Sequence, residues 1–225
     1  MQQNINSIML SMPLGMGNVN CYLIDSDDGH ILIDTGSSNR RKELEIAIGR
    51  LGCRPGLLKL IILTHGDFDH IGNAAYLRAK LGGEICMHQD DLAMAEQGDM
   101  FANRKKPNVV VRKMVPLFLG FGKAQRFSPD FFLADGDNLS EYGFNGRIVT
   151  IPGHSKGSIG ILTAEGSMFC GDLFENTKEP ALNSIMDDPM AAAESIRRLE
   201  HLGVETVYPG HGDPFRIDQF LTERI

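Results

Sequence analysis

The stretch LTHGDFDHIGN (residues 63–73) places two histidines and two aspartates within six residues, from His65 to His70. It follows a mainly apolar run, LLKLIIL, and precedes AAYLRAKLGG, a helix-like segment that ends in glycine. A buried strand therefore delivers these side chains to the turn between a strand and a helix. Imidazoles and carboxylates crowded into one turn indicate a metal site.

Three more residues of the ligand type follow apolar, strand-like runs elsewhere in the chain. They are His154 in TIPGHSKGS, Asp172 in MFCGD and His211 in VYPGHGD, each with a glycine beside it. For any one histidine, an ordinary core or surface role explains the position equally well. Together with His65, Asp67, Asp69 and His70, however, the set exceeds the four ligands of a structural zinc site. The pattern therefore predicts a centre for two metal ions.

The composition narrows the class of protein. A chain of 225 residues that is 42% hydrophobic and 23% charged is expected to form one large domain. The net charge of −7 argues against nucleic acid as a partner. No apolar run approaches the ~20 residues of a membrane span, and the start lacks the basic region of a signal peptide. We therefore expect a cytoplasmic protein with no membrane partner.

Residues 98–128 form a basic segment inside an acidic chain. They hold seven basic residues and one acid, mixed with valine, leucine and phenylalanine. The simplest interpretation of this segment is a solvated loop without a specific function. Two others stay open: a lid whose positive charge attracts an anionic group on a small-molecule substrate, and an apolar contact that forms a homodimer.

The chain resembles the metallo-β-lactamase superfamily over most of its length. THGDFDH is similar to the family's T-H-x-H-x-D-H signature, GHSKGS to its G-H-T-x-G-S turn, CGD to its bridging aspartate and PGHG to its last histidine. NCYLI followed by ILIDTG resembles its opening strands, with Asp34 in a turn that supports the site. The resemblance implies an α+β fold, a four-layer αββα sandwich. We expect one domain over residues 1–225, with residues 98–128 as a lid or insertion and the metals in a cleft along one sheet edge.

The same resemblance implies a ligand set. One ion is expected at His65, Asp67 and His154 and the other at Asp69, His70 and His211, with Asp172 between them; Asp69 and Asp172 are also expected to take part in catalysis. Asp67 stands where the family has its second histidine. Because carboxylates suit harder metals, iron and manganese stay open beside zinc, the first expectation. Alternatively, Asp67 is too short to reach the ion or only accepts a hydrogen bond near it.

The function implied is that of a metallo-hydrolase. A metal-bound hydroxide is expected to attack an ester, thioester or lactone-type small molecule, with an anionic group favoured by the basic segment. Two alternatives stay open. One is an iron-dependent redox protein similar to flavodiiron proteins or persulfide dioxygenases, and the other is a member that binds metal without catalysis.

Overall fold

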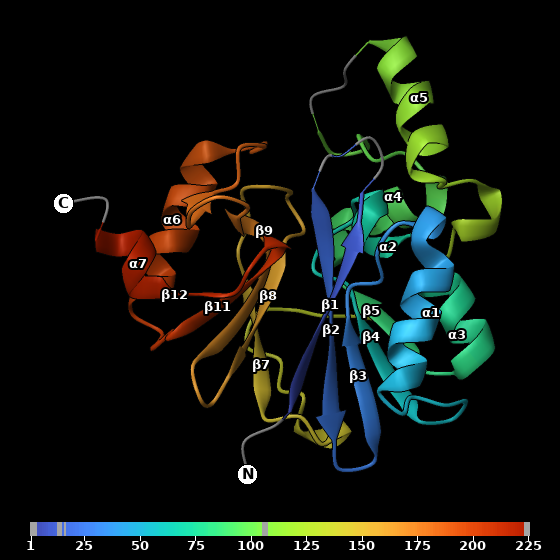
Figure 1. Cartoon of the computed structure of the whole chain (residues 1–225). Helices are drawn as coiled ribbons and strands as arrows, with labels where there is room; N and C mark the ends of the chain where they lie inside the picture. The colour runs from blue at the N-terminus through green and yellow to red at the C-terminus, as the bar shows by residue number, and fades with distance from the viewer. Residues whose placement is uncertain (1–3, 13–14, 16, 105–107, 223–225) are drawn as a thin grey trace.

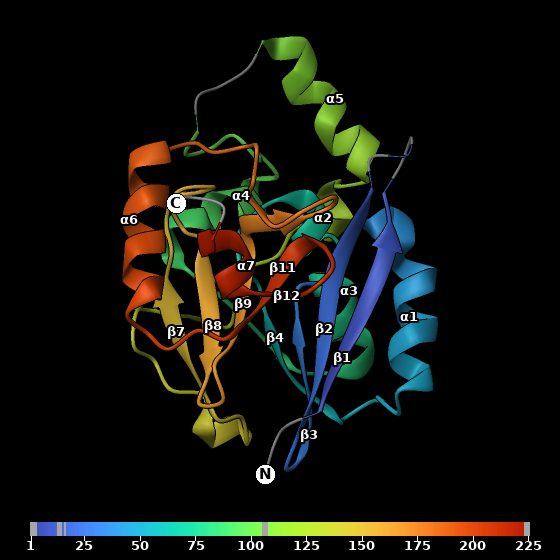
Figure 2. The ribbon, with the colours of Figure 1, turned by 60° about the vertical axis from the view of Figure 1, so that its left-hand side comes forward.

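The computed structural model describes residues 4–12, 15, 17–104 and 108–222. Two sheets of six strands lie face to face, with helices on both outer sides (Figure 1). The view from a second side shows the same layers (Figure 2). This arrangement confirms the four-layer αββα sandwich that the sequence predicted.

The first sheet follows the order of the chain. Its strands are β1 (Ile5–Ser11), β2 (Asn18–Ser26), β3 (Gly29–Ile33), β4 (Leu58–Ile62), β5 (Glu84–Met87) and β6 (Phe131–Phe132). β1, β2 and β3 pair antiparallel, whereas β3 to β6 run parallel. Parallel neighbours need crossover connections, and the helices between β3, β4 and β5 supply them.

The second sheet has the order β12-β11-β9-β8-β7, with β10 paired to β9. Its strands are β7 (Gly146–Thr150), β8 (Ile159–Thr163), β9 (Ser167–Asn176), β10 (Ala181–Leu182), β11 (Thr206–Gly212) and β12 (Phe215–Arg216). β9 and β11 run parallel, and the other pairs are antiparallel. The apolar run before Asp172 in MFCGD belongs to β9, which continues past that residue to Asn176.

Helices cover the two outer faces. α1 (Arg41–Arg50) and α3 (Ala74–Leu81) lie against the first sheet, and α6 (Pro189–Glu200) and α7 (Ile217–Thr222) against the second (Figure 1). α2 (Phe68–Ile71) and α4 (Leu92–Gln97) are short. The basic segment contains α5 (Val109–Leu119), which stands out from the body at one end of the molecule in both views (Figures 1 and 2). Asp188 caps α6 by accepting from the backbone N–H groups of Met190 and Ala191, and Pro189 stands at its first turn.

Successive side chains of a strand point to opposite faces of its sheet, and both faces are covered here. In β3, Ile31 and Ile33 pack between the two sheets, while Leu32 packs toward the helices. A third cluster lies between the second sheet and α6, around Ile196 and Leu199. Each sheet is thus buried on both faces, which favours continuous apolar runs over strict alternation.

Polar contacts join the two sheets where β2 meets β11. The side-chain amide of Asn20 donates to the carbonyl oxygens of Pro209 and Gly212 at 3.0 and 2.6 Å. The hydroxyl of Tyr22 also donates to the Pro209 carbonyl, at 2.6 Å. These bonds hold the end of β11 against the first sheet, next to His211.

Within the described part of the chain, no helix has both the length and the apolar character to cross a bilayer.

Candidate metal centre

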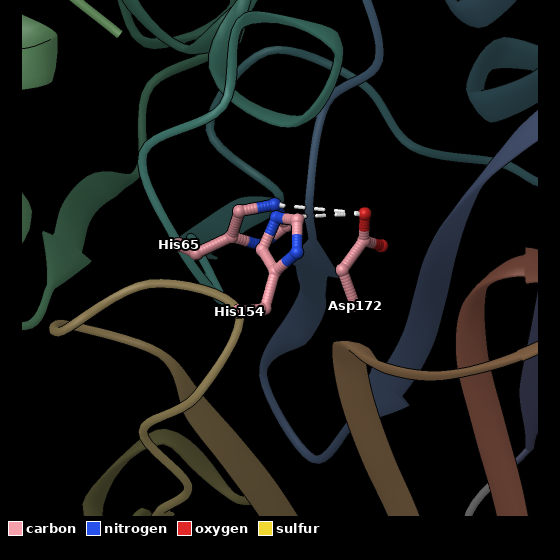
Figure 3. A group of neighbouring side chains, drawn as sticks. All are labelled: His65, His154 and Asp172. Carbon is pink, nitrogen blue, oxygen red and sulfur yellow. Dashed lines mark ion pairs between the residues drawn. The ribbon is translucent and has the colours of Figure 1, made fainter. Parts of the chain in front are cut away.

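The predicted ligands converge at one edge of the sandwich. His65 lies in the turn after β4, His154 follows β7 and Asp172 lies on β9. Potential ligand atoms of these three buried residues all lie within 4.8 Å of one another. Figure 3 shows the Asp172 carboxylate pointing toward both imidazoles. This is the arrangement of donors that a divalent ion requires.

A second group lies beside the first. Asp69, His70 and His211 also place ligand atoms within 4.8 Å of one another. Asp172 lies between the groups: its Oδ1 is 3.4 Å from Nε2 of His70, and its Oδ2 is 3.3 Å from Nε2 of His211 and 3.7 Å from Nε2 of His154. The structure therefore presents two candidate ion positions with one carboxylate between them.

Every histidine of the centre is held by its Nδ1 atom. His70 Nδ1 faces Asp34 Oδ2 at 2.8 Å, and His65 Nδ1 faces Thr64 Oγ1 at 2.9 Å. The acceptors for His154 and His211 are the carbonyl oxygens of Ile185 and Asn18, each at 2.7 Å. With Nδ1–H donating outward, each ring in its neutral form would present the lone pair of Nε2 to an ion in the centre. Such partners fix the tautomer and orientation of metal-binding histidines.

Among the residues that the structure describes, three buried atoms of the centre have no hydrogen-bond partner: Nε2 of His65, Nε2 of His70 and Oδ1 of Asp172. Buried polar atoms nearly always have a partner, so atoms left without one need an explanation. Here they point at the two candidate positions, and an ion at each position would satisfy them. The residues present therefore fit a pair of divalent ions.

Protons and metal ions compete for these donors. Burial alone would lower the pKa of His211, but the Asp172 carboxylate outweighs it and raises that pKa to about 9. Burial likewise acts against the charged form of His70, yet Asp172 and Asp34 raise its pKa. Burial acts to raise the pKa of Asp172, but the imidazoles of His211 and His70 lower it more. The pKa of Asp172 is therefore well below its usual value. Without an ion, these groups share protons, and a bound ion must displace them.

Asp67 lies at the border of the first group. Its Oδ2 is 3.0 Å from Nε2 of His154 and 3.8 Å from Nε2 of His65. Its Oδ1 accepts from Nη1 of Arg104 at 2.5 Å. Burial works to raise the pKa of Asp67, but Arg104 and His154 lower it overall. The carboxylate is therefore ionised and close to the first ion position, and its role as a ligand stays a prediction.

Two candidate ligands lie inside strands, which corrects the expectation that each of them follows one. Asp172 belongs to β9 and His211 to β11. The pairing of β11 with β9 shifts register between Tyr208 and Pro209 and again before His211. A bulge of this kind redirects side chains without ending the strand, which apolar patterning alone does not reveal.

Sequence reasoning missed Asp91, a buried residue that joins two ligand loops. Its carboxylate accepts from the backbone N–H of Gly66 and Gly157 and from the hydroxyl of Ser155, at 2.9, 3.0 and 2.6 Å. Gly66 follows His65, and Ser155 follows His154. Asp91 thus fixes the spacing of two ligands. In the sequence it stands in HQDDLA, just before α4, where an aspartate is typical of a helix start.

A cavity of about 470 Å³ opens over the centre. Its polar side combines residues of the centre with four further polar residues: Asp67, Asp69, His154, Asp172 and His211, and Glu175, Thr177, Asn183 and Ser184. Its apolar wall consists of Met12, Met100, Val115, Phe118, Leu119 and Ile185, four of which belong to residues 98–128. The basic segment therefore borders the candidate site, as a lid would.

Fold and site together define a metallo-hydrolase of the αββα type with a candidate centre for two ions. The sequence signature of the metallo-beta-lactamase superfamily matches residues 14–211, and the chain belongs to that family.

Two curated relatives and one solved structure illustrate the similarity. The human metallo-beta-lactamase domain-containing protein 1 is 28% identical over 211 residues, covering 91% of this chain and 66% of that protein. The hydroxyacylglutathione hydrolase GloC of Haemophilus influenzae is 32% identical over 165 residues, covering 72% of this chain and 69% of the relative. The crystal structure of TTHA1623 in a di-iron-bound form is 27% identical, with a TM-score of 0.72 and 96% of each chain covered.

Proposed function

We propose that the protein is a metal-dependent hydrolase that cleaves an uncharged ester, thioester or lactone with an apolar acyl group. The observation that carries this proposal is the position of the two ligand groups, joined by Asp172, at the polar side of an apolar cavity. Such cavities, with a few convergent polar groups, are typical of sites for small molecules. The relative named hydroxyacylglutathione hydrolase supports an acyl substrate.

The residues of the centre have distinct tasks in this function. His65, His154 and Asp172 would hold one ion, and Asp69, His70 and His211 the other. When bound, two divalent ions supply an activated water and polarise the acyl oxygen. Asp69 lies at the cavity, with Oδ2 3.6 Å from Nε2 of His211, where it can orient a water molecule and accept its proton.

The cavity lining favours an uncharged substrate over the anionic one suggested by the basic segment. Its described part contains acids and histidines but neither lysine nor arginine. Arg104 pairs with Asp67 and Asp187, and Arg112 pairs with Asp99. The described lining therefore offers an anionic substituent remote from the metal centre no free side-chain cation. Lys113, Lys123 and Arg126 are not in the lining, and Lys105 and Lys106 lie outside the described residues.

Zinc is the ion we propose, because the four imidazoles and the carboxylates of the centre are ligands that zinc accepts. Iron has support from the di-iron form of TTHA1623 and from Asp67, an additional oxygen donor. An iron-dependent redox reaction is therefore the second candidate function.

Elemental analysis of purified protein combined with a substrate panel tests the proposal. We expect about two zinc ions per chain and hydrolysis of neutral aryl and alkyl esters or thioesters, lost on dialysis against a chelator and regained with zinc. Iron in the protein together with oxygen consumption would favour the redox candidate. Protein that binds metal but hydrolyses none of the panel would contradict the proposed substrate class.

A further inference from the structure

Arg104 reaches the centre from residues 98–128 and contacts three separate loops. Its side chain is only 5% exposed. Nη1 donates to Asp67 in the turn after β4, Nη2 donates to the His154 carbonyl oxygen at 3.2 Å, and Nε lies 2.5 Å from Asp187 Oδ2 in the loop before α6. A planar guanidinium can span acceptors in this way, whereas a lysine presents a single point charge.

The contact with Arg104 gives the two carboxylate oxygens of Asp67 different partners. Oδ1 is taken by the guanidinium, and Oδ2 faces the imidazoles of His154 and His65. Only one oxygen of this carboxylate is therefore directed at the first ion position. The guanidinium also offsets the negative charge of Asp67, which lies beside the carboxylates of Asp69 and Asp172.

We propose that Arg104 is a positioning residue that restricts Asp67 to a single oxygen toward the first ion. The proposal rests on the metal centre of the proposed function but does not depend on hydrolysis. It also explains how an aspartate can stand beside His65 and His154 without adding a full negative charge to the centre.

Cobalt(II) is a suitable probe because its visible absorbance per ion falls when the number of ligands rises above four. Arg104→Gln should release Oδ1 of Asp67 and allow both oxygens to bind. We expect the absorbance per bound cobalt to fall about two-fold or more, with tighter binding, because the carboxylate is no longer shared. Arg104→Lys retains a donor for Oδ1 and should resemble the parent protein.

Three matched variants separate this role from a general loss of structure. Asp187→Asn removes the other carboxylate partner of Arg104 and should leave the cobalt spectrum unchanged, because Asp67 stays paired. Arg112→Gln removes an ion pair with Asp99 in the same segment and should also have no effect. In an Asp67→Asn background, Arg104→Gln should no longer change the absorbance, since the group through which it acts is gone.

Each outcome decides the proposal. An unchanged spectrum in Arg104→Gln, or the same change in the Asp67→Asn background, would overturn it while leaving the metal centre intact. A parent protein that binds no cobalt would overturn both the metal centre and the role of Arg104. The expected results are a lower absorbance per cobalt in Arg104→Gln and the parent absorbance in Arg104→Lys. The change in Arg104→Gln should also require Asp67.

Discussion

Asp34 Oδ2 lies 2.8 Å from Nδ1 of His70, and the same oxygen accepts from the hydroxyl of Thr64 at 2.8 Å. Thr64 Oγ1 in turn accepts from Nδ1 of His65 at 2.9 Å. One carboxylate thus orients a histidine in each ligand group. Asp34 has a φ of 57°, a conformation that is unfavourable for a residue other than glycine. Strain of this kind persists where the surroundings impose it, which fits a residue placed for a function.

Asp34→Asn should weaken metal binding by about ten- to a hundred-fold, because an amide oxygen that accepts from His70 and the Thr64 hydroxyl leaves the NH2 group facing the backbone N–H of Thr64, which donates to Asp34 Oδ1. Competition with a chromophoric chelator measures the affinity. Asp25→Asn is the matched control, because Asp25 also pairs with a histidine, His30, but is partly exposed and remote from the ligand groups. Equal affinities for the parent and Asp34→Asn would show that the hydrogen bond does not orient the ligand.

Each ligand group should lose its metal ion without loss of the ion from the other group. His211→Ala removes a donor from the second group only, and His154→Ala removes one from the first. We expect each variant to retain about one ion per chain, whereas the parent retains about two. Circular dichroism verifies the fold, and elemental analysis counts the ions. If either variant kept both ions, the assignment of its histidine as a ligand would be wrong.

The family resemblance predicted the sandwich, and the residues themselves indicated the candidate centre for a physical reason. Buried strands are apolar throughout, so His65 and His70 stand out directly after β4, and glycine accompanies His154 and His211. The convergence of these loops follows from the topology of the sheets. The strand that carries Asp172 was indicated, although its end was placed too early.

Arg104 and Asp91 could not be identified in the same way. Arg104 is one of seven basic residues in its segment, and only the fold shows that its guanidinium is buried between Asp67 and Asp187. Asp91 resembles an ordinary residue at a helix start until its contacts with Gly66 and Gly157 are seen. Their partners lie far away in the sequence, and local patterns carry no signal for such pairs.

Metal affinity should rise with pH. The pKa of His211 is about 9 in the ion-free centre, so its imidazole is protonated at pH 7 and an ion must displace that proton. Raising the pH toward 9 removes the competitor, and lowering it strengthens the competition. We expect affinity to rise about ten-fold per pH unit for each proton displaced. Calorimetry in two buffers of different ionisation enthalpy measures the protons released, and His211→Ala should release fewer.

Gly210 should not tolerate a side chain. A Cβ at this position would lie 2.2 Å from Asp172 Oδ1 and 2.8 Å from Cε1 of His70. Gly210→Ala should therefore displace Asp172, reduce the metal content and destabilise the fold by about 1–3 kcal/mol. Gly49→Ala is the control, because the described residues place no atom beyond its chain neighbours and the backbone of its own helix within 4 Å of the added Cβ, and the position is inside α1. That variant should be stabilised by about 0.5–1 kcal/mol in urea unfolding.

Two neighbours on α5 test whether residues 98–128 bind the substrate or another copy of the chain. Phe118 lines the cavity, whereas Leu117 beside it is 75% exposed. If the segment is a lid, Phe118→Ala should raise KM for esters with long acyl chains by about thirty-fold and hardly change KM for acetyl esters, because about 2 kcal/mol of apolar contact is lost. Leu117→Ala should leave both values unchanged.

The charge of the substrate provides the second half of that test. Because the described lining offers no free cation, neutral esters should be hydrolysed with a lower KM than anionic esters of equal length, at low and high salt alike. Arg112→Ser and Lys113→Ser should leave this preference unchanged. A preference for anionic esters that disappears with salt would instead support the basic segment as an electrostatic lid.

A dimer that dissociates in Leu117→Ala, seen by light scattering, would assign the exposed face of α5 to a contact between copies.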